Sequence, residues 1–214
     1  MFLTDAPLVE RRQVARDMWV LGFAAPDIAA SVKAGQFVNI GMRPGPLLRR
    51  PFSVYRAGDD RIEVLLKAVG VGTAQMLAMR EGDVASCLGP LGRGFDLPRS
   101  AKTVTLVSGG LGVAPMPLAA RDARAAGLQV TWVHGARTAD ELCSETVAAA
   151  AQRWPQAQVA VETYMGCGTG VCLGCAVPLT RGGYDRACTE GPVYVASDVD
   201  WPALPSHLSY AVSA

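Results

Sequence analysis

Residues 165–175 read Met-Gly-Cys-Gly-Thr-Gly-Val-Cys-Leu-Gly-Cys, and this stretch decides how the C-terminal part of the chain folds. It contains Cys167, Cys172 and Cys175, and twelve residues separate Cys175 from Cys188. This C-x4-C-x2-C spacing with a distant fourth cysteine is that of plant-type [2Fe–2S] ligands. The interleaved glycines allow the sharp turns that bring thiolates on one tight loop toward one cluster. We therefore predict a [2Fe–2S] cluster on these four cysteines.

A structural zinc site is the alternative reading of four clustered cysteines. Such sites usually consist of two C-x2-C pairs, and only one pair of this kind is present here, which favours the iron–sulfur cluster. The other two cysteines, Cys87 and Cys143, stand alone in apolar stretches. We assign them no chemistry, because isolated buried cysteines are ordinary core residues.

The segment around the cysteines, 164–214, is too short to be stabilised by an apolar core alone, so a bound metal group would supply what is missing. The preceding segment, 101–163, alternates apolar runs that end in glycine with helical stretches, which is typical of βαβ units on a parallel sheet. It predicts a shortened parallel α/β half-domain. Its expected strands cover 104–110, 130–135 and 157–163, and its expected helices cover 116–126 and 139–153.

Residues 1–98 contain short apolar runs separated by Gly, Pro and Asp, which predicts a small antiparallel β-barrel with one helix. The expected strands cover 14–23, 36–42, 52–56, 61–67 and 84–89, and the helix covers 72–80. The fold class is thus α+β, built from several modules.

Two motifs in the barrel indicate a flavin. Arg50, Pro51, Phe52 and Ser53 begin a strand, and an arginine and a hydroxyl beside an aromatic ring can hold an isoalloxazine and its phosphate. The turn 70–73, Gly-Val-Gly-Thr, opens the helix, and a helix N-terminus suits a phosphate. Each motif alone is weak, and each has a plain alternative as a strand entry or a helix cap. Together they predict FAD rather than FMN, because the helix start offers a site for a pyrophosphate.

A glycine-rich loop follows the first expected strand of the α/β segment. It reads SGGLGVAP over 108–115, and its position between a strand and a helix is the one that dinucleotide-binding loops occupy. An ordinary tight turn is the alternative. The candidate contact residues are Gly109, Gly110, Gly112 and Pro115.

Taken in order, the motifs resemble the electron transfer subunits of dihydroorotate dehydrogenase, which are ferredoxin-reductase-like flavoproteins with an added iron–sulfur segment. The motifs are RRPFS (49–53), LLKAVGVGT (65–73), GPLGRGF (89–95), SGGLGVAP (108–115), MGCGTGVCLGC (165–175) and RACTEGPVY (186–194). The resemblance implies that FAD is bound by Arg50, Pro51, Phe52, Ser53, Leu65, Leu66, Lys67, Gly72 and Thr73.

The resemblance also implies a role in pyrimidine biosynthesis. A catalytic subunit would oxidise dihydroorotate at FMN, in a heterotetramer with two of each chain, and electrons would pass through the [2Fe–2S] cluster to FAD and on to NAD+. The chain itself would contribute no catalytic residue, because the cofactors carry the chemistry. Two alternatives remain: a reductase component for a different oxidoreductase, or a non-catalytic remnant that binds zinc.

One departure from the family concerns NAD. The family has a further part of the nucleotide domain with a Cys-Gly-Pro turn, whereas here 161–164 leads directly into the cluster loop and no such tripeptide occurs. We therefore expect weak NAD binding.

The composition excludes some other functions. Twenty basic and nineteen acidic residues give a net charge of +1, which does not indicate a nucleic-acid surface. Neither a signal peptide nor an apolar run long enough to span a membrane is evident, so we expect a cytoplasmic protein without membrane contact.

Overall fold

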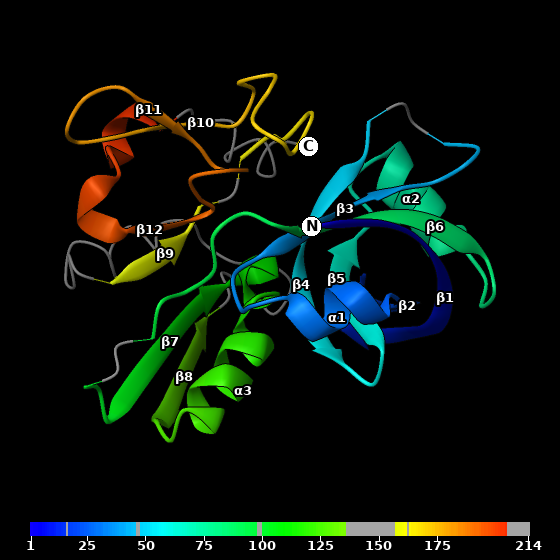
Figure 1. Ribbon diagram of the computed structural model, residues 1–214, viewed down its shortest axis with the longest axis horizontal. Coiled ribbons are helices and arrows are strands. Elements are labelled where there is room, and N and C mark those ends of the chain that lie inside the picture. Colours follow the sequence, from blue (N-terminus) through cyan, green and yellow to red (C-terminus); the bar gives the residue numbers. More distant parts are fainter. Residues whose placement is uncertain (16, 46–47, 98–99, 136–156, 162, 205–214) are drawn as a thin grey trace.

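The computed structural model describes residues 1–204 except 16, 46–47, 98–99, 136–156 and 162. Figure 1 shows three parts: a β-barrel on the right, a small parallel sheet with one helix at the lower left, and the cysteine-containing segment at the upper left. The predicted multi-module α+β architecture, with an antiparallel barrel and a parallel α/β segment, is confirmed. No helix in the described part of the chain is long and apolar enough to cross a membrane.

The barrel closes with the strand order β1-β2-β5-β4-β3-β6, and all neighbouring strands are antiparallel. Its strands are β1 (Phe2–Ala15), β2 (Met18–Ala24), β3 (Phe37–Gly41), β4 (Arg50–Gly58), β5 (Arg61–Lys67) and β6 (Val84–Leu91). The helices α1 (Pro26–Ser31) and α2 (Val71–Ala78) complete it.

The prediction of a single strand over 14–23 is wrong, because the chain forms a hairpin there. Strands β1 and β2 pair on either side of a turn at Asp17, which has a φ of +58°. Aspartate tolerates this left-handed conformation better than most residues do. The long strand β1 and the short helix α1 were not expected from the sequence.

In the α/β segment, β7 (Thr103–Gly109) and β8 (Gln129–Gly135) pair in parallel. The loop after β7 forms the 3-10 helix η1 (Gly110–Val113), and α3 (Met116–Ala125) confirms the helix expected over 116–126. The helix expected over 139–153 lies outside the described residues.

The strand expected over 157–163 does not join this parallel sheet. Within this range the strand is β9 (Gln158–Ala160), and it pairs antiparallel with β12 (Val193–Val195) of the cysteine segment. The reason is burial: Val159 and Val161 pack in the core of that segment instead of against β8.

The cysteine segment shares its core with the barrel. It contains β10 (Ala176–Pro178), β11 (Tyr184–Arg186), β12 and the short 3-10 helices η2 (Ala196–Asp198) and η3 (Trp201–Ala203). Because side chains alternate along a strand, β3 has two buried faces. Val38 and Ile40 lie in the barrel core, whereas Phe37 lies in the core that also contains Cys175 and Cys188. The barrel is therefore the surface on which the cysteine segment folds.

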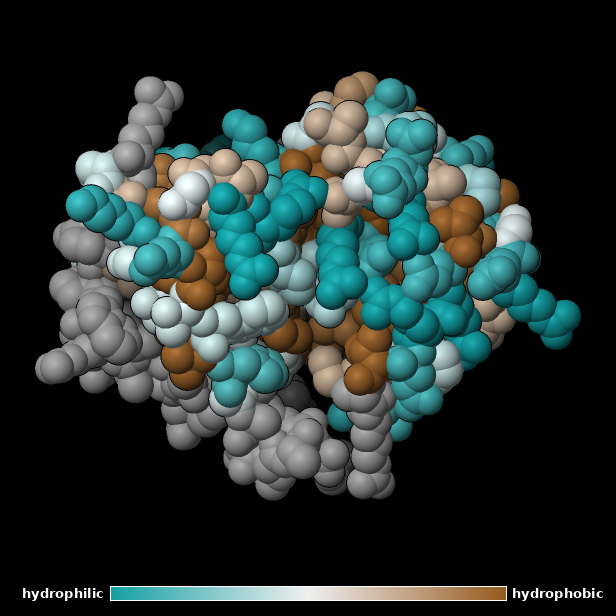
Figure 2. Space-filling view, turned by 90° about the horizontal axis from the view of Figure 1, so that it is seen from below, coloured by the Kyte–Doolittle hydropathy of each residue, from teal (hydrophilic) through white to brown (hydrophobic). Residues whose placement is uncertain are grey.

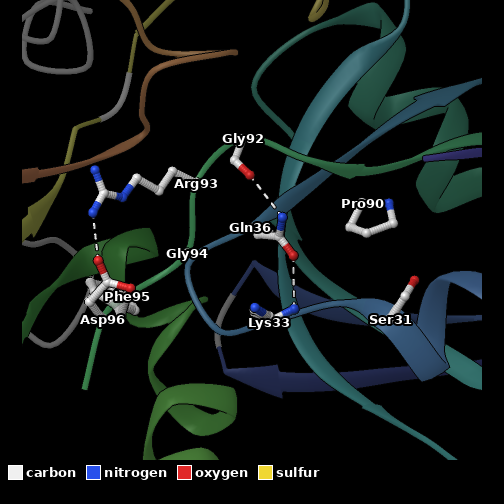
Figure 3. A pocket seen from close by; sticks show the side chains of 9 residues that line it. All are labelled: Ser31, Lys33, Gln36, Pro90, Gly92, Arg93, Gly94, Phe95 and Asp96. Atoms are coloured by element: carbon white, nitrogen blue, oxygen red, sulfur yellow. Dashed lines mark hydrogen bonds and ion pairs between the residues drawn. The ribbon is translucent and has the colours of Figure 1, made fainter. Parts of the chain in front are cut away.

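The linker after β6 holds these parts together (Figure 3). The side chain of Gln36 donates to the carbonyl of Gly92 at 2.8 Å and accepts from the amide of Lys33 at 2.9 Å. Further along, the amide of Arg93 donates to the carbonyl of Gly191 in the cysteine segment. The shallow hollow beside this linker includes none of the predicted cofactor residues.

We predict that Phe37→Ala lowers the free energy of unfolding by about 3–5 kcal/mol, the usual loss for a buried phenylalanine. Phe37 is 2% exposed in the core shared by barrel and cysteine segment. Denaturant unfolding measures the change. Phe2→Ala serves as the control, because Phe2 is 40% exposed and its loss should alter stability by no more than about 0.5 kcal/mol. Equal effects of the two substitutions would contradict the shared core.

Candidate cofactor sites

The four predicted cluster cysteines lie as two pairs. The sulfur atoms of Cys175 and Cys188 are 3.3 Å apart, and both residues are buried. In the second pair, the amide of Cys172 donates to Cys167 Sγ at 3.4 Å, and the side chains of the two residues also interact. Cys172 is exposed, so one edge of the site faces solvent.

Backbone N–H groups point toward the sulfur atoms at the turns of the glycine-rich loop. The amide of Gly170 donates to Cys188 Sγ at 3.1 Å, and that of Thr169 donates to Cys167 Sγ at 3.4 Å. Gly168 and Gly170 make this possible with φ values of +71° and +82°.

The pKa values of the thiols follow from these surroundings. Hydrogen bonds from the amides of Thr169 and Cys172 lower the pKa of Cys167 to about 6. Burial, followed by the hydrogen bond with Cys175, raises the pKa of Cys188 to about 12. The Cys167 thiol therefore ionises more readily than the buried Cys188 thiol.

The paired arrangement fits an iron–sulfur cluster better than zinc. A structural zinc ion needs four ligands around one centre. Within the described ranges, no three His, Cys, Asp or Glu side chains lie close enough to hold a single ion. A [2Fe–2S] cluster instead has two irons that share four protein ligands. Two cysteine pairs, with three cysteines on one loop and Cys188 after β11, match that requirement.

Arg186 and Glu190 hold the cluster loop to its base. Arg186 Nη1 donates to the carbonyl of Gly170 at 3.2 Å, and Glu190 Oε2 accepts from the backbone amide and Nε of Arg186 at 2.7 and 3.0 Å. The hydrogen bonds from Arg186 to Glu190 lower the pKa of the Glu190 carboxyl to about 2, and the bond from the Arg186 side chain is the largest cause. The carboxylate is therefore ionised at neutral pH and fixes the turn after Cys188.

The structure brings together the two predicted flavin motifs. Arg50, Pro51, Phe52 and Ser53 begin β4, and a Cβ placed on Gly72 in the first turn of α2 would lie 2.9 Å from Arg50 Nε. The guanidinium thus packs on the glycine at the helix start. Thr73 caps that helix, because its Oγ1 accepts from the amides of Val69 and Gly70 at 2.9 and 3.1 Å.

The other predicted flavin residues, Leu65, Leu66 and Lys67, end strand β5. Leu65 is buried in a small apolar cluster with Ala114, and Leu111 and Val113 pack against it. The glycine-rich loop therefore lies against the barrel strand that was predicted to contact flavin. Of its candidate residues, Gly109 ends β7, Gly110 and Gly112 lie in η1, and Pro115 precedes α3.

Sequence reasoning missed a polar group at the end of the parallel sheet. Ser108 Oγ lies 2.8 Å from His134 Nδ1 and accepts a hydrogen bond from Trp132 Nε1 at 2.9 Å. Only the parallel register, which sets Ser108 opposite His134, brings these residues together. They fix the strand ends next to the glycine-rich loop.

Sequence reasoning also missed two residues that border the cluster. Asn39 on β3 donates from Nδ2 to the carbonyl of Cys167 at 3.4 Å. Tyr194 packs in the same core as Cys175 and Cys188, and burial raises its pKa. Asn39 Oδ1 and the Tyr194 hydroxyl are the buried side-chain polar atoms without a hydrogen-bond partner among the described residues. Asn39 lies in none of the motifs, and Tyr194 ends the motif at 186–194 without having been assigned a role.

We predict that Cys188→Ser destroys the cluster and that Cys87→Ser leaves it intact. Purified wild type should contain about two iron and two sulfide ions per chain. Cys188 is a buried member of a cysteine pair, whereas Cys87 is buried in the barrel core. Iron and sulfide analysis of the three proteins provides the measurement. Stoichiometric zinc without sulfide in the wild type would contradict the assignment.

Comparison with known proteins agrees with this geometry. Residues 162–200 match the model of the iron–sulfur cluster binding domain of dihydroorotate dehydrogenase B. Among solved structures, that of an NADH-dependent reduced ferredoxin-NADP oxidoreductase superposes with a TM-score of 0.79 at 24% identity, over 93% of this chain and 91% of that one. Phthalate dioxygenase reductase superposes with a TM-score of 0.52 at 25% identity, over 65% of this chain and 46% of that one.

Curated relatives are similar over nearly the whole chain. The electron transfer subunit of dihydroorotate dehydrogenase B (NAD(+)) from Desulforamulus reducens is 30% identical, over 92% of this chain and 98% of the relative. The corresponding subunit from Clostridium acetobutylicum is also 30% identical, over 78% of this chain and 86% of the relative. With its cysteine pairs, barrel and parallel sheet in the expected order, the chain belongs to the family of electron transfer subunits of dihydroorotate dehydrogenase B.

Proposed function

We propose that this protein transfers electrons between a [2Fe–2S] cluster and FAD on behalf of a catalytic subunit that oxidises dihydroorotate, and that NAD+ is the final acceptor. The observation that carries the proposal is the shared core, in which two cluster cysteines pack with a strand of the barrel. A cluster site and a flavin site built on either side of one shared core suit electron transfer. The family membership supports the same role in pyrimidine biosynthesis.

We propose that the segments 1–98, 101–163 and 164–214 have separate roles. Strand β9 lies in the second segment by sequence but pairs with β12 of the third. Cys167, Cys172, Cys175 and Cys188 would hold the cluster. The flavin would lie at the start of β4, the end of β5 and the start of α2. When bound, the two groups supply the one-electron and two-electron chemistry, and the protein positions them and tunes their potentials.

FAD is proposed rather than FMN. The contact between Arg50 and Gly72 places a fixed positive charge at the N-terminus of α2, where the first N–H groups of a helix have no partner within the helix. Positive charge and free N–H groups together favour an anion such as the pyrophosphate of FAD.

The partner is proposed to be an FMN-containing catalytic subunit, with two copies of each chain in a cytoplasmic complex. The cluster has one exposed edge at Cys172. The residues on either side of this cysteine are apolar and exposed, Val171 at 81% and Leu173 at 65%. Exposed apolar groups beside a redox centre suit a protein partner that delivers electrons there. On the face shown in Figure 2, hydrophobic residues are scattered among hydrophilic ones.

NAD is proposed to bind weakly. The glycine-rich loop lies beside Leu65, next to the proposed flavin site. The strand expected to extend the parallel sheet is instead paired with β12. The alignment with the Desulforamulus reducens relative covers 256 positions, more than the 214 residues here, so part of that relative has no counterpart in this chain. Fewer contacts leave more of the ligand in water and reduce affinity.

We predict that Arg50→Ala releases flavin without loss of iron, because the charge at the start of α2 is removed while the cysteine loop is untouched. Chromatography of the released flavin, together with iron analysis, tests this expectation. Arg61→Ala is the matched control, since Arg61 lies in the same barrel but pairs with Glu10 and Glu63. Release of FMN instead of FAD would contradict the assignment.

We also predict that NADH bleaches the flavin only at high concentration, whereas an artificial acceptor readily oxidises the reduced flavin. Anaerobic titration followed at the flavin band provides the measurement. Complete bleaching at micromolar NADH would show that the chain builds a full nucleotide site despite its shortened segment.

A further inference from the structure

Asn39 is a polar interruption in an apolar strand. Its neighbours on β3, Phe37, Val38 and Ile40, are all buried, and Asn39 itself is 1% exposed. Asparagine is unfavourable in strands, where β-branched and aromatic residues are preferred. A buried amide also costs free energy unless its hydrogen bonds are made. Barrel stability alone therefore does not account for this residue.

Within the described part of the chain, only one of the two polar atoms of the Asn39 side-chain amide has a hydrogen-bond partner. Nδ2 donates to the carbonyl of Cys167 at 3.4 Å, whereas Oδ1 is buried without a partner. Uncompensated buried polar atoms are rare in folded proteins. The contact that remains is directed at the first cysteine of the cluster loop, 128 residues away in sequence.

The cluster loop is shaped to fit this amide. A Cβ placed on Gly168 would lie 1.9 Å from Asn39 Nδ2, so any side chain there would displace one of the two residues. Gly168 also has a φ of +71°, which other residues adopt only with strain. The turn after Cys167 thus rests directly on Asn39.

The backbone of Asn39 lies opposite a residue of the flavin motif. In the antiparallel register of β3 and β4, Asn39 is paired with Pro51. The same residue therefore belongs to the sheet that carries the proposed flavin site and hydrogen-bonds to the first cluster cysteine.

We propose that Asn39 is a positioning residue that fixes the cluster loop on the flavin barrel and thereby sets the cluster's reduction potential and its electron exchange with the flavin. The inference rests on the proposed function. Hydrogen bonds and burial around a cluster tune its potential. A loop held in one position also keeps the two redox groups at a constant separation.

Two substitutions test this role. Asn39→Asp keeps the shape but replaces the donor with a carboxylate, and negative charge near the cluster opposes the addition of an electron. We expect a more negative midpoint potential, with iron and flavin contents unchanged. Asn39→Leu removes the hydrogen bond without adding charge. Here we expect an altered electron paramagnetic resonance signal of the reduced cluster and faster loss of iron to a chelator.

Glu63→Gln is the matched control. Glu63 is a buried polar residue of the same barrel, 5% exposed, whose partners Arg12 and Arg61 also lie in the barrel. Its substitution should leave the cluster potential and signal unchanged. If an Asn39 variant fails to fold, Gly168→Ala disrupts the same contact by a change in the cluster loop. It should shift the potential and the resonance signal of the cluster as well.

The outcomes separate this inference from the proposed function. A wild type without iron, sulfide or flavin would overturn the proposed function itself. A wild type with both groups, together with Asn39 variants that keep its potential, resonance signal and iron-release rate, would overturn only the role of Asn39.

Discussion

The burial of two cluster cysteines against the outer face of the barrel is the constraint on which the rest of the structure depends. Cys175 and Cys188 lie in one core with Phe37 and Leu91 of the barrel and with Val159 of β9. The cysteine segment is short, so it cannot bury enough apolar surface by itself. It therefore uses the barrel as one wall of its core, and the site for the cluster forms at that wall.

This arrangement explains why several glycines border the junction. A Cβ on Gly92 would lie 2.6 Å from Pro192 Cδ, and one on Gly35 would lie 2.9 Å from a methyl group of Val193. Both glycines also have positive φ values, so substitutions there would meet strain and collision together. The backbones of the barrel and the cysteine segment are therefore in close contact at both glycines.

The thiol chemistry follows from the same burial. Amide donors keep Cys167 acidic, whereas burial makes the Cys188 thiol resist ionisation without a metal. An iron ion bound at Cys188 would supply the positive charge that favours its thiolate. Cys172 is exposed, so one edge of the site faces solvent.

The sequence by itself determined the antiparallel barrel, through the alternation of apolar residues and turns, and it predicted the cluster ligands and the flavin residues. Each of these depends on local signals: the cysteine spacing, and an arginine and a glycine at element ends. Only the tertiary structure decided where β9 pairs, since a short apolar strand fits either the parallel sheet or the cysteine core, and burial chooses between them. The contact of Asn39 with Cys167 likewise joins residues far apart in the chain. It arises only when strand register and loop docking are both in place, and no local pattern records it.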